Sequence, residues 1–210
     1  MIDIRLWADV RCPWCWIGYH RLRKATALLG EELTVHHRSF LLEPDGPPTA
    51  GQMLPDVATS EWGMMEQQWE RLSSTIREAG REVGLDIAID TALRVDSRAA
   101  HRLLRSVKER ALDVDAAWEI VFAAHLSENL DISSPQVLAE LGRRMGLSDS
   151  EVETAVDSPR LDTAVRDDHD EAVRRGFPSV PTYLLGDHSI SGARSAADIA
   201  SFLHSEAVSR

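Results

Sequence analysis

Two cysteines three residues apart, Cys12 and Cys15, follow a strand-like opening segment and constrain the fold more than any other feature. They are the only cysteines among the 210 residues of the chain. A disulfide closing so short a ring stabilises a fold by only about 2 kcal/mol in the loop-entropy model, so its value would lie in being formed and reduced repeatedly. If a helix begins at Pro13, the two thiols share one helix face, and the helix N-terminus favours a thiolate. The pattern therefore predicts a reversible dithiol site.

Two other interpretations of the cysteine pair remain open. A zinc site usually needs four ligands, and the sequence has no second cysteine pair. The histidines that stand out, His20 and the pair His36-His37, lack the usual ligand spacing. We therefore expect no metal and no bound cofactor. Two inert core cysteines are the second alternative, and redox or thiol chemistry is the prediction that we favour.

The charge of the chain narrows the classes of partner. Lys and Arg number 23 against 34 Asp and Glu, which gives a net charge of -11. This balance argues against nucleic acid or an anionic membrane as a partner. The opening residues lack a basic region and an apolar stretch typical of a signal peptide, and no segment is apolar enough to span a bilayer. We expect a cytoplasmic protein, where disulfides are normally transient and catalytic. The sequence carries no signal for an oligomeric state.

The first part of the chain has a β-α-β pattern. Residues 2–8 alternate between apolar and polar, which predicts a strand. Helical spacing follows over 13–29, with Gly30 as a stop, and a second strand is expected over about 33–42. Such a unit implies parallel neighbouring strands. The segment 43–48, with its prolines and glycine, marks a boundary.

The middle of the chain has helical patterns alone. Apolar residues from Trp62 to Val83 recur at intervals of three and four, which predicts one long amphipathic helix with a packing face. The alternative is that Trp62, Met64 or Met65 faces a substrate. Further helices are expected at 97–110, 115–127, 135–145, 149–156 and 159–175. The acidic run 167–170 is expected to be a solvated helix face, because consecutive helical residues point in different directions.

The last part of the chain returns to strand patterns. A β-prone run ends near Leu185, and Gly186-Asp187 is typical of a hairpin turn. Ser195 is the expected N-cap of a final helix that ends near His204. The order predicts an α/β fold in which two halves of one layer, 1–43 and 159–210, are separated by a helical insertion at 44–158.

Three motifs carry a resemblance to a known family: DVRCPWCWIG at 9–18, SVPTY at 179–183 and SGA at 191–193. Together with the element order, they resemble the DsbA family of the thioredoxin superfamily, and within it the FrnE-type disulfide oxidoreductases. The resemblance implies a thioredoxin-like fold with a large all-helical insertion. It also implies that Pro181 is a cis-proline facing the cysteines, and that Val180 offers its backbone groups to an extended substrate.

The expected chemistry is thiol-disulfide exchange. Cys12, nearer the helix end, is predicted to be the nucleophile, and Cys15 to resolve the mixed disulfide. Trp14 and Trp16 either form an apolar rim around the sulfur or pack in the core, and Trp14 is expected to bind the substrate together with Val180 and Pro181. Asp9 is expected to be a solvated carboxylate, with modulation of the thiols as the alternative.

The direction and the partners of this chemistry are expectations too. A reducing compartment favours reduction or isomerisation of disulfides in proteins or small thiols. Glutathione or a thioredoxin-type donor would supply the electrons.

Two other functions stay open. Kappa-class glutathione transferases and 2-hydroxychromene-2-carboxylate isomerases are similar in architecture and use glutathione on small aromatic substrates, but they typically lack an intact cysteine pair, so Cys15 argues against them. The other alternative is a redox-regulated, chaperone-like binding module, whose helical insertion holds a client.

Overall fold

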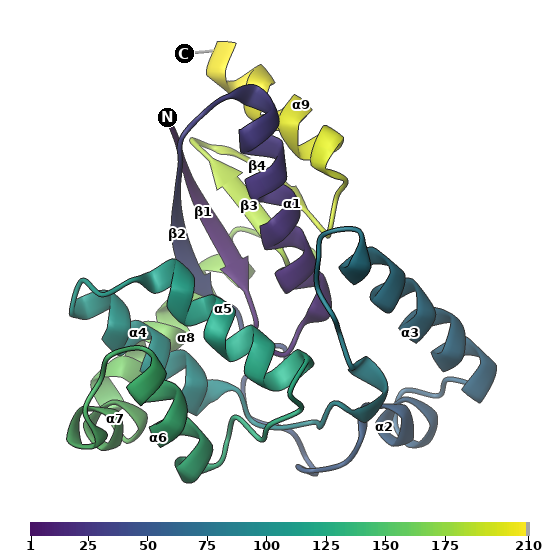
Figure 1. The fold of residues 1–210 in the computed structure, drawn as a ribbon, viewed down its shortest axis with the longest axis vertical. Coiled ribbons are helices and arrows are strands. Elements are labelled where there is room, and N and C mark those ends of the chain that lie inside the picture. The colour runs from purple at the N-terminus through teal and green to yellow at the C-terminus, as the bar shows by residue number, and fades with distance from the viewer. Residues whose placement is uncertain (209–210) are drawn as a thin grey trace.

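A four-stranded sheet built from both ends of the chain forms the centre of the fold (Figure 1). The computed structural model describes residues 1–208. The strands lie in the order β2-β1-β3-β4. They span Ile2–Ala8 (β1), Leu33–Ser39 (β2), Thr182–Leu185 (β3) and His188–Ser191 (β4). β1 pairs with β2 in parallel, whereas β3 runs antiparallel to both β1 and β4. The predicted parallel pair and the hairpin are therefore confirmed.

Helix α1, which connects the parallel strands, has the predicted bounds, Pro13–Leu29. Pro13 occupies its first position, where a missing N–H breaks no hydrogen bond, and Gly30 ends it with a φ of 66°. The second strand is shorter than predicted. It ends at Ser39, and the Phe40 N–H still donates to the carbonyl of Ala8 at 2.9 Å before the chain turns away.

Helices occupy most of the chain between β2 and β3. They are α2 (Leu54–Ser60), α3 (Glu66–Arg81), a short 3-10 helix η1 (Ile89–Thr91), α4 (Arg98–Glu109), α5 (Val114–Leu126), α6 (Pro135–Arg144), α7 (Asp149–Val156) and α8 (Pro159–Arg174). Helix α9 (Ala196–Val208) follows the hairpin, and Ser195 caps it by accepting the Asp198 N–H at 3.1 Å. Figure 1 shows α1 across one face of the sheet, with α2 to α7 gathered at the end where β1 leads into α1.

The long helix predicted over 62–83 is wrong at its N-terminal end. The chain forms two helices there, α2 and α3, and Gly63 between them adopts a φ of 66° that a side chain would disfavour. The packing face therefore begins at Trp69, which is 6% exposed, whereas Trp62 and Met65 are 51% and 63% exposed. The prediction failed because Trp62 and Met65 continue the apolar spacing of the helix in the sequence, whereas in the structure both residues precede α3.

The acidic run 167–170 is not a uniformly solvated face. Asp168 is 4% exposed and lies 2.6 Å from Arg38 and 3.4 Å from Arg105. Its carboxylate also accepts the Ser39 N–H at 3.2 Å. Asp167 and Asp170 are exposed, as expected. Helix α8 packs against β2, and this contact buries one residue of the run.

The largest group of buried apolar residues joins the sheet to the helices. It includes Trp7 and Ile17 from the β-α-β unit and Leu103, Trp118 and Phe122 from α4 and α5. A smaller group fills the space between the sheet, α1 and α9. The larger group of buried residues includes members from both sides of the predicted boundaries. The division into 1–43 with 159–210 and an insertion at 44–158 stays a prediction.

Candidate active site

The two cysteines lie at the start of α1, one turn apart. Cys12 is the N-cap residue, with an extended backbone, and its carbonyl accepts the Cys15 N–H at 3.0 Å. Both are free thiols. Cys12 is 8% exposed and Cys15 is fully buried. Only Cys12 is therefore within reach of a molecule outside the protein.

The two thiols lie in different electrostatic surroundings. Burial raises the pKa of Cys15 well above its usual value, and a hydrogen bond with Cys12 and the charge on that residue raise it further. Cys15 therefore keeps its proton until a reaction step removes it. Cys12, at the N-cap, has the helix amides and dipole beside it, an arrangement that favours negative charge.

A cis peptide bond between Val180 and Pro181 lies against α1, as the resemblance implies. A Cβ atom at Gly18 would lie 2.6 Å from Cγ of Pro181 and 2.3 Å from Oη of Tyr183. Only glycine therefore lets the helix approach this closely. Neither the N–H nor the C=O of Val180 hydrogen-bonds to another residue within 1–208, so both groups remain free to pair with an extended chain.

Tyr183 and Gly18 are residues of this site that the sequence prediction missed. The Tyr183 ring is fully buried on β3, and its hydroxyl has no hydrogen-bond partner among the described residues. Burial raises the pKa of Tyr183 strongly, and the charges of Cys15 and Cys12 add to this rise. The sequence held one signal for Gly18: a glycine inside a predicted helix lowers stability, so its presence indicates a close contact that no side chain would allow.

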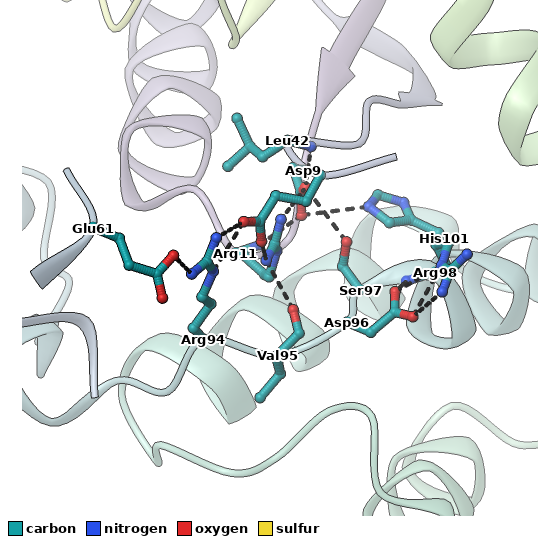
Figure 2. Close-up of polar contacts among 11 residues, drawn as sticks. Asp9, Arg11, Leu42, Glu61, Arg94, Val95, Asp96, Ser97, Arg98 and His101 are labelled. Atoms are coloured by element: carbon teal, nitrogen blue, oxygen red, sulfur yellow. Dashed lines mark hydrogen bonds and ion pairs between the residues drawn. The ribbon is translucent and has the colours of Figure 1, made fainter. Parts of the chain in front are cut away.

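Asp9 is not the solvated carboxylate that we predicted. It is fully buried, and its two oxygens accept the N–H groups of Arg11 at 3.0 Å and Leu42 at 2.8 Å (Figure 2). The Ser97 hydroxyl donates to it at 3.4 Å, and Nε2 of His101 lies 3.6 Å away. Burial raises the pKa of Asp9, but His101 and Arg11 outweigh burial and hold it well below its usual range. Asp9 directly follows the strand predicted over 2–8, and the sequence pattern gave no sign of these partners.

A chain of ion pairs continues from Asp9 toward α2. The Arg11 guanidinium donates to Glu43 at 2.6 Å and to the carbonyl of Val95 at 2.8 Å. Arg94 also donates to Glu43. It reaches Glu61 at 2.5 Å (Figure 2). The network thus contains three carboxylates, from Asp9, Glu43 and Glu61, and two guanidiniums, from Arg11 and Arg94. The network fixes the turn before Cys12 to the loop before α4.

A cavity of about 420 Å³ lies beside Cys12. Pro13 and Trp14 line it on the α1 side, and Trp62, Trp69 and Leu72 line it on the side of α2 and α3. Trp14 therefore lies in the wall of this cavity, and its role in substrate binding stays a prediction.

Trp16 differs from Trp14. It is 4% exposed, it stacks on Phe122 with ring centres 6.0 Å apart, and its Nε1 donates to Glu119 at 2.7 Å. Of the two roles considered for Trp16, the structure therefore shows packing.

The described residues contain no group of three or more His, Cys, Asp or Glu side chains arranged to hold a metal ion. Of the histidines that the sequence singled out, His37 bonds to Asp115 at 2.7 Å, His36 to Asp3 at 2.9 Å and His20 to Glu119 at 2.8 Å. Within 1–208, no helix combines the length and the apolar character needed to cross a membrane.

Comparisons with known proteins agree with this geometry. The family model described as a DSBA-like thioredoxin domain matches residues 3–204. A probable DsbA oxidoreductase from Streptomyces coelicolor is 27% identical, with a TM-score of 0.92 over 100% of this chain and 92% of that chain. The cytosolic disulfide reductase DsbM from Pseudomonas aeruginosa is 19% identical, with a TM-score of 0.66 over the full length of both. A putative protein disulfide isomerase from Nitrosomonas europaea is 16% identical, with a TM-score of 0.73 over 99% of this chain and 98% of that chain. The search of the curated proteins found no match.

Proposed function

Because the chain belongs to the DSBA-like thioredoxin domain family and is a thiol-disulfide oxidoreductase, we propose that it reduces or isomerises disulfides through Cys12 and Cys15. The observation that carries the proposal is the difference between the two thiols. One lies at the helix end and is partly exposed, and the other is buried behind it with a raised pKa. The assignment to the FrnE-type group stays a prediction.

The proposed reaction has two steps. The Cys12 thiolate attacks a substrate disulfide, so that a bond from Cys12 to one substrate sulfur forms while the substrate S–S bond breaks. The released thiolate takes a proton. Cys15 then loses its proton and attacks the sulfur of Cys12, which forms the Cys12–Cys15 disulfide and releases the second substrate thiol. Two electrons have moved from the protein to the substrate.

Val180, Pro181 and Trp14 are proposed to bind the substrate. The free backbone groups of Val180 would pair with the chain on either side of the substrate cysteine. Trp14 would contact the group that enters the cavity beside Cys12. In this arrangement, Pro181 separates the substrate strand from Gly18 and the buried thiol.

The electrostatics support reduction as the direction. A strong oxidant of this kind needs a stabilised reduced form. Here Arg11, the cation adjacent to Cys12 in the sequence, donates to Glu43 and Val95 instead. The backbone of Asp9 lowers the pKa of Cys15 by a hydrogen bond and its carboxylate raises it, while burial remains the main cause of the raised pKa. The helix end is therefore not reinforced by a free cation from Arg11, and we expect the pair to donate electrons.

The regenerating donor is proposed to be a small thiol such as glutathione or a thioredoxin-type protein, in the cytoplasm. The similarity to a cytosolic disulfide reductase, which has also been solved with GSH, supports this proposal. The substrate of the reaction would be a protein disulfide or a small disulfide.

The test of the proposal is reduction of insulin with glutathione as the donor. We expect turnover by the parent and background rates for Cys12→Ser and Cys15→Ser. A matched assay with reduced, unfolded ribonuclease measures oxidation, for which we expect a much lower rate. Insulin reduction by Cys12→Ser at the parental rate would overturn the assignment of Cys12. Faster oxidation than reduction would overturn the direction.

A further inference from the structure

The cavity beside Cys12 has walls that are unusual for a surface hollow, because three tryptophans contribute to them. Trp14 comes from α1, Trp69 from α3 and Trp62 from the segment between α2 and α3. Leu54, Leu72 and Ile76 are among the residues that extend the apolar surface. At about 420 Å³, the cavity falls within the range of small-ligand pockets, about 300 to 1,000 Å³. It has room for a ring system and not for a folded segment of a protein.

The charged residues at the cavity are already paired with one another. Arg11 and Arg94 both donate to Glu43, Arg94 also pairs with Glu61, and Asp9 lies 3.7 Å from Arg11. Of these carboxylates only Glu43 lines the cavity, together with the guanidiniums of Arg11 and Arg94, which already donate to Glu43, Glu61 and the carbonyl of Val95. An anionic group would therefore have to displace an existing ion pair, whereas an uncharged group meets an apolar wall.

His125, one of the residues that line the cavity, carries a buried polar atom without a hydrogen-bond partner among the described residues. The residue lies on α5 and is 1% exposed, and the atom is its Nδ1. Burial lowers the pKa of His125 to about 4, so the ring is neutral at pH 7. A buried polar atom without a partner costs stability, and a ligand that supplies the missing hydrogen bond removes that cost.

We infer that this cavity binds an uncharged aromatic ring attached to the substrate disulfide, and that a polar group on the ring hydrogen-bonds to Nδ1 of His125. The inference rests on the proposed function and names the substrate class of the same site. Tryptophan faces favour an aromatic partner over an alkyl group of similar size. The ring belongs either to a small aromatic disulfide or to an aromatic side chain beside a cysteine in a polypeptide.

The first experiment measures single-turnover reduction by the reduced protein, without any donor. One arm compares mixed disulfides of N-acetylcysteine methylamide with phenylethanethiol or butanethiol, whose leaving thiols are both primary alkanethiols. The other arm compares the disulfide-linked dimers of the dipeptides Cys-Trp and Cys-Ala. We expect the aromatic member to react about tenfold faster in at least one arm. The arm in which this happens identifies the source of the ring.

Variants connect that preference to the cavity. Trp62→Ala should bring the aromatic-to-alkyl rate ratio close to 1, because it removes an aromatic wall of the cavity. The variant should fold normally, because Trp62 is half exposed and its loss leaves the core intact. Leu28→Ala is the control, because Leu28 is similarly exposed on α1 but does not line the cavity, and its ratio should equal that of the parent. Equal rates for aromatic and alkyl members in both arms would overturn the inference and leave the proposed function standing. No reaction with any disulfide would overturn both.

The second experiment tests the role of His125 with the dimers of Cys-Tyr and Cys-Phe. We expect the hydroxyl to raise the rate about fivefold in the parent. His125→Leu should abolish that advantage, whereas His125→Asn, which keeps a polar atom close to the position of Nδ1, should retain part of it. An unchanged Tyr-to-Phe ratio in His125→Leu would overturn the role of His125.

Discussion

Asp9 shows how one buried side chain organises the residues around the cysteines. It is fully buried, and it accepts hydrogen bonds from the turn that presents Cys12, from Leu42 after β2 and from Ser97 before α4. A buried carboxylate is tolerated only when its charge and its hydrogen-bonding capacity are satisfied, and here both conditions are met. Asp9 therefore holds three segments of the chain in register with the active site.

We predict that Asp9→Asn lowers the free energy of unfolding by about 1 to 3 kcal/mol, because one of the two oxygens that accept the N–H groups of Arg11 and Leu42 becomes an NH2 group and leaves a buried N–H without an acceptor. Asp3→Asn is the matched control. Asp3 is exposed and pairs with His36, whose side chain is 43% exposed, so the loss of this pair should cost about 0.5 kcal/mol or less. Urea denaturation of both variants provides the measurement, and equal losses for the two would contradict the account.

His125 predicts a pH dependence of stability. Its pKa is about 4 in the folded protein against an ordinary 6.5, because burial disfavours the charged ring. Above pH 6.5 both states are neutral at this position. As the pH falls from 6.5 to 4, the unfolded chain gains a proton that the folded protein does not bind, and about 3 kcal/mol of stability is lost.

His125→Asn should therefore make the free energy of unfolding less dependent on pH in this window. Leu28→Ala is the control, because Leu28 is exposed and has no group that titrates, so this variant should leave the slope close to that of the parent. Denaturant unfolding at several pH values measures the slopes, and identical slopes in the parent and in His125→Asn would contradict this assignment.

At the scale of elements, the contact between α1 and the cis-proline segment positions the site. The bounds of α1 could be predicted from the sequence, since Pro13 and Gly30 mark its ends locally. The resemblance implied that Pro181 faces the cysteines, but local patterns could not predict its contact with Gly18, because this contact joins residues that are distant in the chain. The break before α3 was missed for a related reason: the apolar spacing continued through Gly63, and only the backbone of that residue shows the interruption.

We predict that Gly18→Ala destabilises the protein by about 1 to 3 kcal/mol. Alanine is the better helix former by about 1 kcal/mol, but its methyl group would lie 2.3 Å from the Tyr183 hydroxyl and 2.6 Å from Pro181. The overpacking therefore exceeds the gain in propensity.

Tyr183→Phe removes the nearer of the two contacts. By itself, this substitution should be close to neutral, since the Tyr183 hydroxyl has no hydrogen-bond partner among the described residues. The double variant with Gly18→Ala should recover part of the loss. Thermal unfolding of the two single variants and the double variant measures this coupling, and strict additivity would contradict the packing argument.

At the scale of the whole molecule, the sheet and the helical segment share one core. Trp7 and Ile17 belong to the same apolar cluster as Leu103, Trp118 and Phe122. The element order indicated that a helical segment interrupts the α/β layer. The ion pairs that join Arg11, Glu43 and Arg94 could not be predicted, because they depend on how that segment docks.

The shared core predicts that the molecule unfolds in one transition, although the sequence divides it into 1–43 with 159–210 and a segment at 44–158. Near-ultraviolet circular dichroism reports the buried tryptophans, and far-ultraviolet circular dichroism reports the helices. We expect the two urea transitions to coincide. A helical signal that outlasts the tertiary signal would contradict this prediction.

The central claim is that Cys12 attacks the substrate and that Cys15 resolves the intermediate. Its most direct test is mass spectrometry of the mixed disulfide formed when a peptide disulfide is added to Cys15→Ala and, separately, to Cys12→Ala. We predict that Cys15→Ala accumulates one peptide adduct, which peptide mapping assigns to Cys12, and that Cys12→Ala forms no comparable adduct, because its remaining thiol is buried and has a raised pKa. An adduct that forms on Cys15 of Cys12→Ala at a similar rate would contradict the account.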